Sequence, residues 1–295
     1  MKNHKAGFVN IIGNPNVGKS TLMNAFVGEK LSIITSKAQT TRHRILGIVN
    51  GEDFQMIVSD TPGIIKPAYE LQESMMDFVK SAFEDADILL YMVEIGEKGI
   101  KDENYLRRLE ASKIPVLLLI NKIDLSNQET LEEQVAYWQG VLPNAEIHPI
   151  AALKNFNIPE VFERILELLP EAPPYFPKDQ LTDKPERFFV NETIREKILQ
   201  FYKKEIPYAV EIETEEFLES EDIIRIRAVI MVERDSQKGI IIGHKGAALK
   251  KVGVEARKDL EKFFEKQVHL ETYVKVNKNW RSNPGQLRRF GYQQK

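Results

Sequence analysis

The first 170 residues alternate between two hydrophobic patterns. Short apolar runs, which are typical of strands, cover residues 7–12, 44–50, 54–59, 87–93, 115–120 and 146–150. Apolar residues at helical spacing lie between them, over residues 19–28, 70–84, 101–112, 129–140 and 157–169. This alternation predicts an α/β fold with a mostly parallel sheet. Ligands bind such sheets at the carboxyl ends of strands, so residues just after the strands are the candidates for chemistry.

A different pattern follows the proline-dense segment at residues 170–177. Proline excludes a helix interior and favours an extended path, so this segment predicts a domain boundary. Helical spacing then covers residues 188–204 and 247–265, and strand patterns cover 208–215, 223–233 and 268–276. We therefore expect a first domain over residues 1–172, a linker over 173–187 and a smaller α+β domain over 188–295.

Composition narrows the class of protein. The 295 residues are 42% hydrophobic and 29% charged, which is ordinary for a globular protein with a sizeable core. Cysteine is absent, which excludes disulfides and cysteine-based zinc sites and favours the reducing cytoplasm. No apolar leader pattern follows Met1, and the apolar run at 114–120 is too short to span a bilayer.

Charge is unevenly distributed along the chain. Residues 238–295 contain 14 Lys and Arg but only 5 Asp and Glu, whereas residues 1–237 contain 27 and 39. A basic end on an acidic chain suggests a local site for a polyanion, although solvated surface charge is the ordinary alternative.

The most informative motif lies between the first strand and the first helix. Residues 13–20 follow the G-x-x-x-x-G-K-[ST] pattern, in which Gly13 and Gly18 permit a turn whose N–H groups point at phosphate oxygens. Lys19 adds a positive charge, and the Ser20 hydroxyl can bind Mg²⁺. The predicted phosphate site comprises Gly13, Asn14, Pro15, Asn16, Val17, Gly18, Lys19, Ser20 and Thr21.

The sequence Asp60-Thr61-Pro62-Gly63 follows the 54–59 strand. A carboxylate at this position can hold the Mg²⁺ shell through water, and Gly63 lets its N–H approach a γ-phosphate. The polar loop at residues 37–44 lies between the first helix and the second strand and can be ordered by the same phosphate and ion.

The sequence Asn121-Lys122-Ile123-Asp124 follows the buried 115–120 strand. The Asp124 carboxylate can accept two N–H bonds from the guanine edge, a donor pair that adenine lacks. Asn121 can tie the loop together, and the Lys122 stem can lie along the base. We therefore expect a guanine nucleotide.

Together these motifs resemble the translation-factor-like class of GTPases over about residues 5–170. The resemblance implies that Thr41 binds Mg²⁺ and that Lys19, Thr41 and Gly63 take part in catalysis, with GTP, GDP and Mg²⁺ as ligands. The base-contacting loop usually reads Ser-Ala-Leu or Ser-Ala-Lys, but here it is Ala151-Ala152-Leu153. Without the serine hydroxyl, we expect guanine affinity to be somewhat weaker.

A further departure concerns hydrolysis. Ras-like enzymes orient the attacking water with a Gln just after D-x-x-G, where this chain has Ile64. Slow intrinsic turnover is therefore expected. Asn16 occupies the position at which related GTPases hold K⁺, so a K⁺ ion there is a hypothesis carried over from the resemblance.

The second domain contains Gly243-His244-Lys245-Gly246 between two predicted helices. A G-x-x-G turn lets a nucleic-acid backbone approach without interference from Cβ atoms, and the helix end and Lys245 favour phosphates. With its strand and helix order, this domain resembles the KH domain in its type II topology. The predicted RNA-binding residues are Gly243, His244, Lys245, Gly246, Lys250, Lys251, Lys275, Lys278 and Arg281.

Trp280, Leu287 and Phe290 in the C-terminal segment allow two interpretations. They can stack on bases, or they can pack the end of the chain onto its domain. We expect packing for Leu287 and Phe290, because large apolar side chains more often belong to a core.

A GTPase domain followed by a type II KH domain and this C-terminal segment resembles the Era family of bacterial GTPases over nearly the whole chain. The resemblance implies binding to the 3′ end of small-subunit ribosomal RNA, a role in small ribosomal subunit assembly, and a cytoplasmic location with some peripheral inner-membrane association. We expect a monomer. The alternative is a GTP-dependent scaffold that recruits proteins at the membrane surface, with the KH-like unit as a protein interface instead of an RNA site. The acidic face of Glu211, Glu213 and Glu215 would suit either function.

Overall fold

Residues 4–293 are described by a computed structural model and divide into two units. The first unit comprises residues 4–68 and 72–183, and the second comprises residues 69–71 and 184–293.

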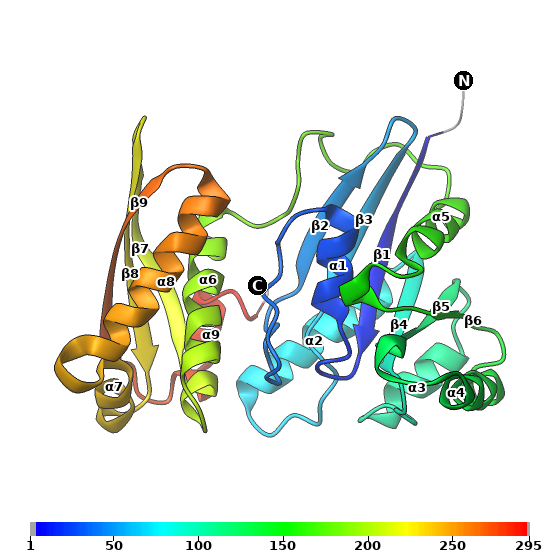
Figure 1. The fold of residues 1–295 in the computed structure, drawn as a ribbon, viewed down its shortest axis with the longest axis horizontal. Helices are drawn as coiled ribbons and strands as arrows, with labels where there is room; N and C mark the ends of the chain where they lie inside the picture. Colours follow the sequence, from blue (N-terminus) through cyan, green and yellow to red (C-terminus); the bar gives the residue numbers. More distant parts are fainter. Residues whose placement is uncertain (1–3, 294–295) are drawn as a thin grey trace. The chain divides into compact units, whose positions relative to one another are not determined.

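The first unit is built on a sheet with the strand order β2-β3-β1-β4-β5-β6 (Figure 1). Its strands are β1 (Lys5–Gly13), β2 (Ile45–Asn50), β3 (Phe54–Asp60), β4 (Ile88–Glu94), β5 (Val116–Asn121) and β6 (Glu146–Pro149). Only the β2–β3 pair of this sheet is antiparallel, as far as the described residues extend. The prediction of a mostly parallel sheet is confirmed.

Strand register brings the carboxyl ends of the central strands to one edge. Ile11 lies opposite Asp60, Gly13 opposite Met92, and Glu94 opposite Asn121. The residues that follow β1, β3 and β5 therefore lie at one edge of the sheet, where the sequence motifs were expected to meet.

Helices pack against the sheet and bury its strands, which explains why the strand sequences are apolar. These helices are α1 (Lys19–Val27), α2 (Glu70–Glu84), α3 (Glu103–Glu110), α4 (Gln128–Val141) and α5 (Ile158–Leu168). Residues of β4 and β5 such as Leu90, Val93 and Leu118 are fully buried. Helix α1 packs against β1, β2, β3 and α5, with the rings of Phe26 and Phe162 5.8 Å apart.

The segment expected to be a linker differs from the prediction. The Gln55 side chain accepts hydrogen bonds from the Tyr175 and Phe176 N–H groups, and Thr182 forms an isolated bridge with Gly47. Residues 173–183 therefore belong to the first unit, because they bond to the edge strand β2 and to the Gln55 side chain of β3. The division between units falls after Asp183.

The second unit follows the predicted order of elements. It contains α6 (Glu186–Phe201), β7 (Glu211–Glu219), β8 (Ile223–Val232), α7 (Asp235–Ile242), α8 (Ala247–Phe264), β9 (Gln267–Val276) and α9 (Pro284–Arg289). The sheet order is β7-β8-β9, with β7 antiparallel and β9 parallel to β8. Its core includes Ile194 of α6, Ile230 of β8 and Leu260 of α8.

Strand β7 begins later than expected. The sequence predicted a strand over residues 208–215, but residues 206–208 form a 3-10 turn and β7 continues to Glu219. A register shift between Thr214 and Glu216 interrupts the alternation of faces along β7.

Within residues 4–293, none of the helices combines the length and apolar character that crossing a membrane would require.

Candidate functional site

The loop between β1 and α1 depends on glycine at two positions. Gly13 has φ 152° and Gly18 has φ 109°, values that disfavour L side chains. A Cβ atom on Gly13 would lie 2.2 Å from the Met92 carbonyl oxygen, and one on Gly18 would lie 2.2 Å from the Asn121 amide nitrogen. The turn therefore cannot close around any larger residue at these positions.

Lys19 is enclosed by this loop. Its ammonium group donates to the carbonyl oxygens of Gly13 at 3.1 Å and Asn14 at 2.8 Å. Burial lowers the pKa of Lys19 to about 8, although the carboxylates of Asp60 and Glu97 oppose this shift. A buried cation inside a ring of backbone groups suits the phosphates of a nucleotide, whose charge would favour its protonated form.

Three oxygen-bearing side chains meet beside Lys19. The Ser20 hydroxyl lies 2.7 Å from Asp60 Oδ2 and 3.0 Å from Thr41 Oγ1, and Thr41 Oγ1 donates to Asp60 Oδ2 at 3.2 Å. Burial raises the pKa of Asp60, and the charge of Lys19 opposes that rise. Asp60 Oδ1 is buried with no hydrogen-bond partner among the residues that the structure describes. Two hydroxyls and a carboxylate are a donor set that fits Mg²⁺.

The loops after β5 and β6 meet at Asn121. Its amide nitrogen donates to the Val17 carbonyl at 2.7 Å, and its Oδ1 accepts the Ala152 N–H at 2.9 Å. Ala151 and Phe156 exchange two backbone hydrogen bonds at 3.2 Å. The 151–156 loop is thus closed by backbone bonds, although it lacks the serine hydroxyl of the usual pattern.

One cavity of about 550 Å³ joins the two ends of the site, from Ser20 and Thr41 to Asp124. Of the predicted nucleotide-binding residues, those lining it are Pro15, Asn16, Gly18, Lys19, Ser20, Thr21, Gly63, Asn121, Lys122, Asp124 and Leu153, with Thr41 of the switch loop. The predicted residues outside this lining are Gly13, Asn14, Val17, Asp60, Thr61, Pro62, Ala151 and Ala152. Thr61 is buried and donates to the Ile11 carbonyl, so its hydroxyl supports the strand end.

Sequence reasoning missed several residues of this cavity, namely Ile33, Ile34, Thr35, Ser36, Glu94 and Leu125. Glu94, at the end of β4, forms an ion pair of 2.7 Å with the Lys122 ammonium. Leu125 lines the cavity and is 73% exposed. Glu94 is the last residue of a buried strand, as Asp60 is, but no motif marked it.

The loop after β3 approaches the phosphate loop closely. A Cβ atom on Gly63 would lie 2.6 Å from Pro15 Cα. Ile64 is fully buried, and its N–H donates to the Gly13 carbonyl at 3.0 Å. Asn16 donates from its amide to the Ser36 carbonyl at 3.0 Å, which joins the phosphate loop to the residue just before the 37–44 loop.

In the second unit, the G-x-x-G turn connects α7 to α8. Gly243 and Gly246 have φ values of 70° and 77°, and the space around a Cβ on Gly246 is open to 4 Å. His244 and Lys245 are exposed. The Tyr202 hydroxyl donates to the Ile241 carbonyl at 2.7 Å, which ties the end of α7 to α6. The backbone of the turn is therefore accessible at Gly246, and the end of α7 that leads into it is held by α6.

The predicted cations do not form a single face. Lys250 and Lys251 are exposed on α8, and the Lys251 ammonium lies 4.3 Å from the centroid of the Phe201 ring. Lys275 lies on the opposite face of the sheet, because its neighbour Val274 points into the core. Lys278 is exposed beyond β9, whereas Arg281 hydrogen-bonds to Glu233 with both Nε and Nη2.

The C-terminal segment packs onto the second unit. Trp280 is fully buried and donates from Nε1 to the Ala209 carbonyl at 3.3 Å; Leu287 is also fully buried. The Trp280 and Phe290 ring centroids are 5.8 Å apart. Packing of Leu287 and Phe290 was expected and is observed. Trp280 is not placed to stack on a base.

The C-terminal segment also forms hydrogen bonds and an ion pair with the acidic side chains of β7. Tyr292 donates to Glu211 at 2.7 Å, and Arg289 donates to both carboxylate oxygens of Glu213 at 2.6 Å. The prediction that Glu211 faces solvent is wrong, since Glu211 is 7% exposed. The face was misassigned because β7 is covered by residues 76 and 81 positions later in the chain, a contact that local alternation cannot reveal.

Two families match this chain in the same order as the two units. The family described as "50S ribosome-binding GTPase" matches residues 8–122, and the KH domain family matches residues 205–281. Fold, phosphate loop and G-x-x-G turn thus define a GTPase joined to a KH domain.

The chain belongs to the Era family. It is similar to Era in complex with MgGDPNP and nucleotides 1506–1542 of 16S ribosomal RNA, with 38% identity and a TM-score of 0.94 over 99% of this chain and 100% of that one. It is also similar to an Aquifex aeolicus Era variant bound to GDP·AlF4⁻, with 39% identity and a TM-score of 0.94 over 98% of this chain and 100% of that one.

Proposed function

We propose that this GTPase is a switch that binds the 3′ end of small-subunit ribosomal RNA through its KH unit and assists assembly of the small ribosomal subunit. The observation that carries the proposal is the presence, in one chain, of a guanine-nucleotide cavity and an open G-x-x-G turn. Era bound to MgGDPNP and 16S ribosomal RNA has the same two domains over the same length, which supports it.

Different residues of the cavity would bind the phosphates and the Mg²⁺ ion. The backbone N–H groups of residues 13–18 and the Lys19 ammonium would hold the phosphates, and Ser20, Thr41 and Asp60 would hold Mg²⁺. When bound, Mg²⁺ neutralises charge on the β- and γ-phosphate oxygens during transfer. Gly63, without a Cβ, can bring its N–H to the γ-phosphate.

Base selection would come from the other end of the cavity. Asp124 can accept both guanine N–H groups, and Asn121 holds its loop against the phosphate loop. Because the Ile64 side chain is buried, no group at that position orients water, and we propose slow intrinsic hydrolysis. A K⁺ ion at Asn16, a cytoplasmic location, peripheral membrane association and a monomeric state stay predictions.

RNA binding would be centred on the G-x-x-G turn. Its open backbone and the exposed Lys245, Lys250 and Lys251 are suited to single-stranded RNA phosphates. The acidic strand favours neither RNA binding nor the scaffold alternative, because the C-terminal segment covers Glu211 and pairs with Glu213. The feature that distinguishes them is the G-x-x-G turn with its exposed cations.

The test measures binding of labelled single-stranded RNA matching the small-subunit ribosomal 3′ end. The double variant H244D/K245D should lose at least tenfold in affinity at low salt, because it adds negative charge where phosphates approach. The double variant K262D/Q267D is the matched control, since it makes a similar change in charge at exposed positions near the other end of α8.

The proposal expects the native chain and the control to bind with similar affinity, and binding to weaken steeply as salt rises. Absence of RNA binding by the native chain at low salt would overturn the RNA role. Equal loss in both variants would show that binding follows net charge rather than the G-x-x-G turn.

A further inference from the structure

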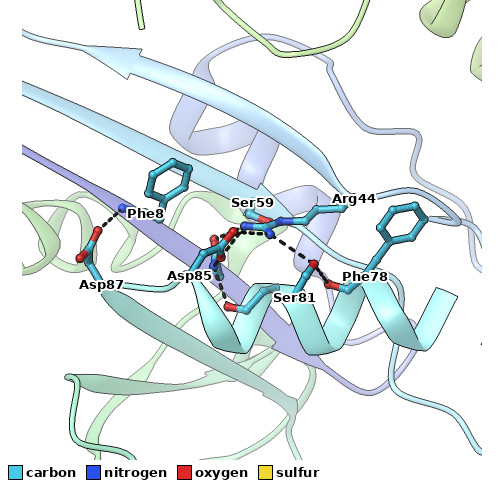
Figure 2. Close-up of polar contacts among 9 residues, drawn as sticks. Phe8, Arg44, Ser59, Phe78, Ser81, Asp85 and Asp87 are labelled. Carbon is cyan, nitrogen blue, oxygen red and sulfur yellow. Dashed lines mark hydrogen bonds and ion pairs between the residues drawn. The ribbon is translucent and has the colours of Figure 1, made fainter. Parts of the chain in front are cut away.

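Arg44, immediately before β2, connects three elements of the first unit (Figure 2). Its Nε donates to the Ser59 hydroxyl on β3 at 2.7 Å. Its two terminal nitrogens donate to the two carboxylate oxygens of Asp85 at 2.6 and 2.8 Å, just beyond the end of α2. Nη2 also donates to Asn10 Oδ1 on β1 at 3.2 Å. The guanidinium side chain is only 12% exposed.

These contacts lie next to the magnesium-binding candidates without including them. Arg44 follows Thr41 by three residues, and Ser59 directly precedes Asp60. The hydroxyl of Thr41 and the carboxylate of Asp60 are 3.2 Å apart. Arg44 therefore fixes the backbone on which Thr41 is carried and bonds to the residue beside Asp60.

Asp85, the ion-pair partner of Arg44, is positioned by further hydrogen bonds. Asn10 donates from its amide to Asp85 Oδ1 at 2.7 Å and to the Ala82 carbonyl at 2.7 Å. Two residues later, Asp87 accepts the Phe8 N–H at 2.8 Å, as Figure 2 shows. The turn after α2 is thus bound to β1, and it gives Arg44 a fixed point of attachment.

The loop that carries Thr41 is attached at both ends. At its start, the Asn24 side chain of α1 accepts the N–H groups of Leu31 and Ser32 at 3.0 and 2.9 Å. At its end, the loop meets β2 through Arg44. A loop without helix or strand keeps much of its conformational entropy unless such contacts restrict it.

We propose that Arg44 is a positioning residue for the triphosphate-bound state of this GTPase. By anchoring the end of the loop that carries Thr41 to β3 and to the turn after α2, it places the Thr41 hydroxyl beside Ser20 and Asp60. The inference rests on the nucleotide-binding role of the cavity proposed above.

The effect should depend on which nucleotide is bound. Switch loops of GTPases are ordered by the γ-phosphate and Mg²⁺ and are released after hydrolysis. Loss of the Arg44 anchor therefore weakens binding of a triphosphate, which uses Thr41, and leaves GDP binding unchanged. A residue with a general stabilising role would weaken both.

The variant Arg44→Lys tests this directly. Lysine keeps the charge but is a point donor, and it cannot contact Ser59, Asn10 and both oxygens of Asp85 together. Affinity for a non-hydrolysable GTP analogue with Mg²⁺ should fall about tenfold, while affinity for GDP changes less than about twofold.

Arg164→Lys is the matched control. Two nitrogens of Arg164 also donate to the two oxygens of one carboxylate, that of Glu146, at 2.8 and 2.7 Å. The partners of Arg164 lie on β6 and α5, away from the nucleotide cavity. The control should leave both nucleotide affinities unchanged.

A second readout needs no nucleotide. Hydrogen exchange of the nucleotide-free protein should become faster across residues 37–44 in Arg44→Lys and stay unchanged there in Arg164→Lys. Asp85→Asn, at a half-exposed side chain, should weaken GTP-analogue binding in the same selective way. The double variant R44K/D85N should be no weaker than R44K, because both changes break one interaction.

Equal loss of GTP-analogue and GDP affinity in Arg44→Lys would overturn the inference, as would affinities equal to those of the native chain. If the native chain itself bound neither nucleotide, the proposed function would fail first, and the two failures are therefore distinguishable.

Discussion

Asn121 is the residue on which three loops of the nucleotide cavity depend. Its amide binds the Val17 carbonyl on one side and the Ala152 N–H on the other, and it is 3% exposed. Both partners are backbone groups with little access to water. Removing the side chain would leave them unpaired, which costs about 1–3 kcal/mol for each buried group.

We predict that Asn121→Ala lowers affinity for GTP analogue and GDP by the same factor, about tenfold or more. The effect is equal because Asn121 supports the base end of the cavity, which both nucleotides use. Titration of each nucleotide measures it. Asn127→Ala, which removes one exposed helix-capping bond to the Thr130 N–H, is the control and should change neither affinity. A loss confined to the GTP analogue would contradict this explanation.

At the scale of elements, the C-terminal segment stabilises the second unit. Residues 277–293 contact β7 and the residues just before it, through bonds to Ala209, Glu211 and Glu213. In this segment Trp280 and Leu287 are fully buried. A three-stranded sheet with one uncovered face would expose residues such as Val229, which is fully buried here. The segment therefore completes the unit.

We predict that Leu287→Ala destabilises the second unit by about 2–5 kcal/mol, the usual range for truncating a buried leucine. Native-state hydrogen exchange of β7 and β8 amides measures this unit without interference from the first. Leu218→Ala, at a β7 side chain that is 57% exposed, should change stability by less than about 0.5 kcal/mol. Unchanged exchange in Leu287→Ala would show that the segment is dispensable.

At the scale of the whole molecule, the chain has two ligands, RNA and a guanine nucleotide, and its charge is unevenly distributed along the sequence. Residues 238–295 carry a net positive charge, which suits RNA, whereas the remainder of the chain carries a net negative charge. A ligand shifts a conformational equilibrium only through its different affinities for the two states. If GTP changes RNA affinity, RNA must change GTP affinity equally.

We predict that a GTP analogue raises RNA affinity at least about fivefold relative to GDP, and that saturating RNA raises affinity for the analogue over GDP by the same factor. Two titrations of the full chain, one for each ligand, measure both factors. RNA affinity that is identical in the two nucleotide states would refute the coupling while leaving RNA binding intact.

Local spacing was sufficient to predict much of the site. The phosphate loop, Asp60 and Asp124 follow strands, and parallel strands must bring such positions to one edge. Gly13 and Gly18 were identifiable from the G-x-x-x-x-G-K-[ST] pattern, because the turn it describes needs positive φ angles that disfavour larger residues. Helix and strand order in the second unit was also readable, since each element carries its own hydrophobic period.

The sequence alone therefore determined the fold class, the two domains, the nucleotide motifs and the G-x-x-G turn, because each depends on residues within a few positions of one another. Only the tertiary structure decided that Arg44 binds Asp85, that Tyr292 covers Glu211, and that residues 173–183 join the first unit. These contacts join residues 41, 81 and more than 100 positions apart. Such pairings follow from which faces meet after packing, and no local period encodes that.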